Sequence, residues 1–168
     1  MLFRSTNAAV ATASSVEGGQ LLVVKVKQGA TVNAYGVNCG QPGMSLLSDT
    51  ASLPRVGQAF TSRISRVPTT SAAVMSIGLS NTTINGSPLP MSLGSYGLPG
   101  CFLYHDGAFG FAFPCASLSS NTAQFTLNVP SSQVFVGMKV FLQAWAPDAS
   151  ANAGGLIGTN ALEIKIGF

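Results

Sequence analysis

Apolar and polar residues alternate with a period of two in short runs along this chain, and no stretch shows a convincing amphipathic helical pattern. Residues 72–79 show the alternation clearly, with Ala73, Met75, Ile77 and Leu79 on one face and Ser76 and Gly78 on the other. Because successive side chains of a strand point to opposite sides, this pattern predicts a strand with one buried face. The same reasoning predicts strands at 21–27, 31–35, 58–67, 88–93, 101–104, 109–113, 123–129 and 161–167.

The longest strand candidate, residues 134–145, is apolar on both faces. One face carries Val134, Val136, Met138, Val140 and Leu142, and the other carries Phe135, Phe141 and Trp145. A strand of this kind lies in the centre of a sheet or is covered by a partner.

The turn signals between these runs indicate the fold class. Asn85-Gly86 predicts a hairpin turn, and residues 101–104 and 109–113 are expected to form a second hairpin around Asp106-Gly107. About nine or ten short strands with turns between them predict an all-β fold, an antiparallel β-sandwich of jelly-roll or immunoglobulin-like type.

Residues 1–19 are rich in small side chains and end at Gly18-Gly19. We expect them to form a flexible N-terminal arm, which is either disordered or ordered against a neighbouring subunit. Residues 20–168 then form a single sandwich domain. Two irregular stretches within it, 36–57 and 146–160, are candidate contact surfaces.

The charge content excludes several classes of protein. Only 8% of residues are charged and 46% are hydrophobic, which argues against a disordered chain. A net charge of +3 without clustered Lys and Arg argues against a nucleic-acid partner. No apolar run approaches the roughly 20 residues of a membrane span. The N-terminus lacks a strongly apolar core, so we expect no signal peptide in this sequence: either the chain is not exported by that route, or a signal has already been removed.

The residues that carry catalysis are scarce. The chain has one histidine, His105, and its neighbour Asp106 is placed in a turn. There is no Gly-x-Ser-x-Gly motif and no phosphate-binding loop. Asp148 stands alone, whereas calcium usually takes clustered acids. We therefore expect no enzyme, no cofactor and no metal site.

Three cysteines are present, which allows one disulfide and one remaining thiol. Cys101 and Cys115 flank the second expected hairpin symmetrically and are able to face each other across it. Alternatively, Cys39, Cys101 and Cys115 are all buried free thiols, because free cysteine behaves as a small apolar residue.

Several local patterns, in this order and spacing, resemble a domain of large secreted or surface proteins of planctomycetes and related bacteria. They are Tyr35-Gly36-x-x-Cys39, Pro54-x-Val56-Gly57-x-x-Phe60, Gly97-Leu98-Pro99-Gly100-Cys101, Val136-Gly137-x-x-Val140-Phe141-x-Gln143 and Leu162-x-Ile164-x-Ile166-Gly167. The resemblance covers about residues 34–167 and implies a β-sandwich at a surface. It also favours a Cys39–Cys101 disulfide. The chain departs from the pattern in carrying Cys115 and in lacking an export signal.

These observations favour a non-catalytic structural protein that self-assembles or coats a surface. Scarce charge leaves few repulsive groups between subunits, so apolar patches and sheet edges are able to pack. The location is then a virion, in a decoration, capsid or fibre protein, or the extracellular surface, in a matrix or filament subunit. The expected assembly contacts are Phe3 and Arg4 in the arm and Met44, Leu46 and Leu47 in the long loop.

The alternative is a surface binding module that recognises carbohydrate or an envelope protein through its loops. Tyr96 and Trp145 are its possible ligand contacts, since aromatic rings stack on sugars. A tryptophan at the end of an apolar strand is otherwise a core residue.

Overall fold

The computed structural model describes residues 10–12, 25–27, 29–41, 43–49, 51–69 and 71–168. These residues form strands and two short 3-10 helices, with no α-helix among them. The first strands are β1 (Val10–Thr12), β2 (Lys25–Lys27), β3 (Thr31–Tyr35), β4 (Ser45–Ser48), β5 (Ala59–Ser65), β6 (Val74–Gly78), β7 (Thr83–Ile84) and β8 (Ser87–Pro88). They are followed by β9 (Met91–Ser92), η1 (Gly94–Tyr96), β10 (Phe102–Leu103), β11 (Gly110–Pro114), β12 (Ala116–Ser119), β13 (Thr122–Asn128), η2 (Gln133–Phe135), β14 (Lys139–Pro147) and β15 (Leu156–Lys165).

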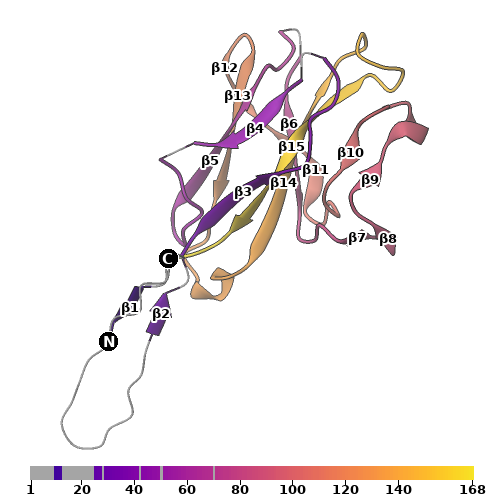
Figure 1. The fold of residues 1–168 in the computed structure, drawn as a ribbon. Coiled ribbons are helices and arrows are strands. Elements are labelled where there is room, and N and C mark those ends of the chain that lie inside the picture. The colour runs from indigo at the N-terminus through magenta and orange to yellow at the C-terminus, as the bar shows by residue number, and fades with distance from the viewer. Residues whose placement is uncertain (1–9, 13–24, 28, 42, 50, 70) are drawn as a thin grey trace, which may run out of the picture.

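Two antiparallel sheets pack face to face and form a β-sandwich (Figure 1). One sheet has the order β11-β6-β14-β15-β3 and the other has the order β12-β13-β5-β4. In immunoglobulin nomenclature, β4, β5, β13 and β12 take positions A, B, E and D, and β11, β6, β14 and β15 take positions C′, C, F and G. The predicted all-β sandwich is therefore confirmed, with the immunoglobulin-like strand order. β3 adds one further strand beside β15.

The core lies between the two sheets and is built by the alternation that the sequence shows. Phe60 and Ile64 of β5 are fully buried and face Met75 of β6 and Leu142 of β14 in one cluster. The opposite residues of β5, such as Arg63, point to solvent.

A long insertion, residues 79–109 between β6 and β11, covers the outer face of β14. Its hairpin β7–β8 turns at Asn85-Gly86, both with positive φ, as predicted. On this outer face Gln143 bonds to Phe102 and Tyr104 of the insertion, Phe141 packs against Tyr35 of β3, and Trp145 bonds to Ser76 of β6, so the outward residues of β14 are buried as well. The prediction of a central strand is confirmed, and the covering segment belongs to the same chain.

Other local predictions are wrong. Residues 101–104 and 109–113 do not form a hairpin, because β10 pairs with β9 and β11 pairs with β6. Residues 134–145 do not form one strand: they begin with η2, where Val134 is 79% exposed, and Gly137 has a φ of 89°. The positive φ interrupts the extended chain, so β14 starts at Lys139.

The two irregular stretches are also shorter than expected. Residues 36–57 contain β4, and residues 146–160 contain the start of β15. Near the N-terminus, β1 pairs with β2 as a small ribbon that extends away from the sandwich (Figure 1). The rest of the arm, and most of the expected strand at 21–27, lie outside the described residues.

Candidate functional site

An apolar groove opens between the two sheets beside β11. It has a volume of about 380 Å³ and receives side chains from both sheets and from η2. Its main walls are formed by Phe109, Phe113, Leu127, Phe135, Met138 and Ile166. Asn128 is the one polar residue of the lining, and no charged side chain takes part in it.

The course of the chain explains why the groove forms here. β11 lies at the edge of one sheet and β12 lies at the edge of the other, with only Cys115 between them, so the chain passes from sheet to sheet. The pairing of β11 with β6 shifts between Gly110 and Phe113, which marks a β-bulge. Phe109 remains 52% exposed, so an apolar ring faces solvent at the groove.

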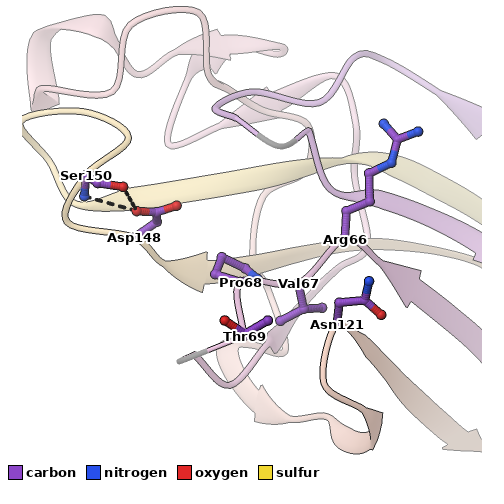
Figure 2. A pocket seen from close by; sticks show the side chains of 7 residues that line it. All are labelled: Arg66, Val67, Pro68, Thr69, Asn121, Asp148 and Ser150. Carbon is purple, nitrogen blue, oxygen red and sulfur yellow. Dashed lines mark hydrogen bonds between the residues drawn. The ribbon is translucent and has the colours of Figure 1, made fainter.

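A second, more polar pocket of about 460 Å³ lies at one end of the sandwich (Figure 2). Arg66 and Thr69 come from the β5–β6 loop, Asn121 from the β12–β13 turn, and Asp148 and Ser150 from the β14–β15 loop. Variable domains gather their B–C and F–G loops at one end in the same way and bind ligands there. The guanidinium of Arg66 points away from the carboxylate of Asp148 (Figure 2).

Hydrogen bonds hold the Asp148 side chain in its loop. Ser150 donates to Asp148 Oδ1 from its hydroxyl, at 2.6 Å, and from its backbone N–H, at 3.0 Å. The bonds from Ser150 lower the pKa of Asp148. The carboxylate therefore stays ionised, and its Oδ1 already accepts two hydrogen bonds from Ser150 within the same turn.

The two aromatic candidates for ligand binding are not brought together into one site. Tyr96 lies in η1 and is 67% exposed, so its role as a ligand contact stays a prediction. Trp145 is only 7% exposed, and its Nε1 donates to Ser76 Oγ at 3.1 Å. The prediction of Trp145 as a ligand contact is wrong, because the indole is enclosed between Ser76 of β6 and Gly158 of β15 and is not open to a ligand. A Cβ at Gly158 would lie 2.7 Å from the indole.

His105 and Ser76 are hydrogen-bonded, but the direction of the bonds is unsuited to catalysis. Gly107 N donates to His105 Nδ1 at 3.0 Å, so the imidazole proton lies on Nε2 and is donated to Ser76 Oγ at 2.9 Å. Ser76 Oγ in turn donates to the carbonyl of Gln143 at 2.8 Å. Burial lowers the pKa of His105 to about 4, against smaller opposing contributions from Asp106 and Ser76. The neutral pair connects the insertion to β6.

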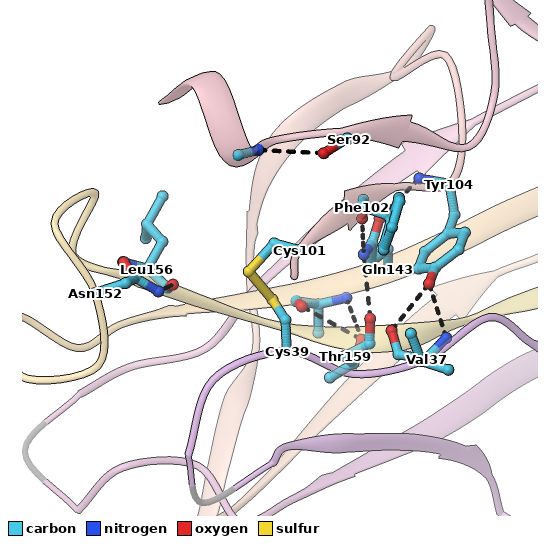
Figure 3. Close-up of a disulfide and its surroundings, with 12 residues drawn as sticks. Val37, Cys39, Ser92, Cys101, Phe102, Tyr104, Gln143, Asn152, Leu156 and Thr159 are labelled. Carbon is cyan, nitrogen blue, oxygen red and sulfur yellow. Dashed lines mark hydrogen bonds between the residues drawn. A yellow bond between two sulfur atoms is a disulfide. The ribbon is translucent and has the colours of Figure 1, made fainter. Parts of the chain in front are cut away.

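Gln143 makes a second polar connection to the insertion, this time from β14 (Figure 3). Its Nε2 donates to the carbonyls of Phe102 and Thr159, and its Oε1 accepts from the N–H of Tyr104. The Tyr104 hydroxyl donates to the carbonyl of Val37 and accepts from the N–H of Val37. The buried amide is therefore satisfied at both ends, as a buried polar group requires.

The disulfide joins Cys39 to Cys101 (Figure 3), which confirms the pairing implied by the resemblance and contradicts a Cys101–Cys115 bridge. Leu98 packs with the disulfide in a small apolar cluster. Cys115 is half-buried, and burial raises its pKa to about 11, so its thiol is protonated at neutral pH.

The expected assembly contacts have different outcomes. Met44 and Leu46 are fully buried, so their prediction as surface contacts is wrong: this part of the loop folds into β4 and joins the core. Asn160 also binds both the N–H and the carbonyl of Leu46, at 2.9 and 3.0 Å. Leu47 is exposed and stays a candidate. Phe3 and Arg4 lie outside the described residues.

Sequence reasoning missed the groove, although part of its signal is present. Phe109 and Phe113 stand out in the sequence as aromatic residues close to one turn, but the β-bulge between Gly110 and Phe113 breaks the regular alternation there. The approach of Phe135 and Met138 from a later part of the chain is not visible in that local pattern.

Among the residues that the structure describes, no three His, Cys, Asp or Glu side chains gather closely enough to hold a metal ion. The described part of the chain also lacks a helix with the length and apolar character needed to cross a membrane. No protein family, curated protein or solved structure matches the chain in the comparisons made. The disulfide indicates an oxidising, non-cytoplasmic environment.

Proposed function

We propose that this protein is a non-catalytic structural module that assembles with copies of itself or coats a larger particle. The observation that carries the proposal is the apolar groove, with the exposed ring of Phe109 beside it and no charged residue in its walls. When another apolar surface covers an uncharged apolar surface, both leave water and the complex is stabilised.

Two further observations support this role. The Ser76 hydroxyl donates its proton to a backbone carbonyl, which suits a structural connection rather than a nucleophile. The disulfide is compatible with a protein of a virion or of a cell surface, and the resemblance to bacterial surface domains favours the cell surface.

The mass of the full chain in solution tests the proposal. We expect size exclusion with light scattering to give a multiple of 17.1 kDa that dissociates on dilution. Phe109→Asp places a charge in the groove and is expected to shift the mass to that of one chain. Leu118→Asp is the matched control, because Leu118 is 50% exposed on β12 and lies outside the groove lining. A single-chain mass at every concentration contradicts self-assembly.

A binding module is the second candidate, and the loop pocket of Figure 2 favours it. Arg66, Thr69 and Asn121 offer polar groups for a carbohydrate or an envelope protein. A glycan array tests this candidate, with Arg66→Ala expected to abolish any signal. Arg63→Ala removes the same charge from the outer face of β5 and serves as the control. Equal loss in the two variants would assign the signal to net charge.

A further inference from the structure

We infer that the apolar groove receives the N-terminal segment of a second copy of this chain, with residues 21–26 inserted beside β11. The inference rests on the proposed self-assembly and specifies how it occurs. It follows from the position and the sequence of the whole N-terminal segment before Gly29 (residues 1–28, here called the arm), and from the chemistry of the groove.

The arm leaves the sandwich next to the groove. The backbone of Gly29 and Ala30 lies against Gly167 so closely that a Cβ at position 167 would collide with it. Ile166, the preceding residue, lines the groove and pairs through its N–H with the carbonyl of Met138 at 2.9 Å. The exit of one arm and the groove therefore lie at the same end of the molecule.

The described part of the N-terminal segment, the ribbon of β1 and β2, projects away from the body of the sandwich (Figure 1). In the described residues, β1 pairs with β2 alone. An isolated two-stranded ribbon is only marginally stable in water, so packing against another surface stabilises it. A second copy offers such a surface in its groove.

The sequence of the arm matches the groove in polarity. Residues 1–24 carry only two charged side chains, Arg4 and Glu17. Residues 21–26 read Leu-Leu-Val-Val-Lys-Val. In an extended segment Leu22, Val24 and Val26 share one face, which suits an apolar groove, and Lys25 lies on the other.

The groove also offers a backbone partner. β11 is the edge strand of its sheet, and an extended segment is able to add to such an edge while alternate side chains fill the adjacent groove. Val26 lies four residues from Ala30, which is a span of about 13 Å when extended, so residues 21–26 reach a second copy only where the two copies meet at this end of the sandwich.

Two full-length variants and their mixture test the inference. Leu22→Asp with Val24→Asp disables the arm, and Phe109→Asp disables the groove. We expect each variant to weaken self-association by roughly 100-fold, since each places charge against apolar surface. An equimolar mixture is expected to recover association, because the intact arms of the groove variant enter the intact grooves of the arm variant.

The controls separate this mechanism from general effects of charge and folding. Ser14→Asp with Ser15→Asp adds the same charge to the arm outside residues 21–26, and Leu118→Asp adds a charge outside the groove. Both controls are expected to associate as the unmodified chain does. Circular dichroism checks the fold, and Phe109→Ser replaces Phe109→Asp if the charged variant does not fold.

The outcomes distinguish the inference from the proposed function. If the unmodified chain associates and the arm variant associates equally well, or if the mixture gives no recovery, arm insertion is refuted while self-assembly stands. If the unmodified chain has the mass of one chain at every concentration, self-assembly is refuted as well.

Discussion

Acid is expected to loosen the attachment of the insertion through His105. This residue is buried and neutral, with its Nε2 bonded to Ser76 Oγ, and its pKa is lowered to about 4 by burial. In the unfolded chain the pKa returns to the ordinary value of about 6.5. Between these two values the unfolded chain binds more protons than the folded protein, so the free energy of unfolding falls as the pH is lowered.

The magnitude follows from the size of the pKa shift. At about 1.4 kcal/mol for each pH unit, the full loss is about 3 kcal/mol, and most of it is reached by pH 4.5. Above pH 6.5 the contribution is flat. For a domain of this size, such a loss lowers the midpoint of urea unfolding by about 1 M.

Urea unfolding at several pH values between 7 and 4.5 measures this loss. His105→Gln is the comparison, because glutamine retains hydrogen-bonding groups without titrating, and His105 is the only histidine in the chain. The remaining pH dependence of His105→Gln reports on all other groups. If the difference between the two proteins does not change with pH, the assignment of the acid sensitivity to His105 is refuted.

Two further predictions concern stability. Replacing Cys39 and Cys101 by alanine is expected to lower the free energy of unfolding by about 4 kcal/mol, because the bridge spans 62 residues. Thermal unfolding measures the effect, with Cys115→Ala as the control. An equal loss of stability in the two variants would contradict the prediction. Ser62→Ala is expected to raise the free energy of unfolding by about 1 kcal/mol, because the buried Ser62 Oγ has no hydrogen-bond partner in the described structure. Ser76→Ala is the opposite case, since the Ser76 hydroxyl is fully bonded, and a stabilising effect there would refute the reasoning.

The face on which each side chain lies could be predicted from the sequence for several strands. β5, β6, β13 and β15 bury the residues that the alternation marks as inward, such as Phe60 and Met75. The turn at Asn85-Gly86 was equally predictable. Both features arise from local chemistry, namely the period of two along a strand and the tolerance of Asn and Gly for positive φ.

The partners of those faces depend on segments far apart in the chain. Leu46 appeared to belong to a surface loop, yet it is buried because β4 joins β5 and Asn160 binds its backbone. Trp145 is buried although it lies on the face of β14 opposite the core, because its indole lies against Ser76 and Gly158 of the two neighbouring strands. The groove brings Phe109 and Phe135 together from separate elements. The alternation along a strand shows which of its faces is apolar. Burial of that face requires a second surface, and only the folded chain shows which distant segment supplies it.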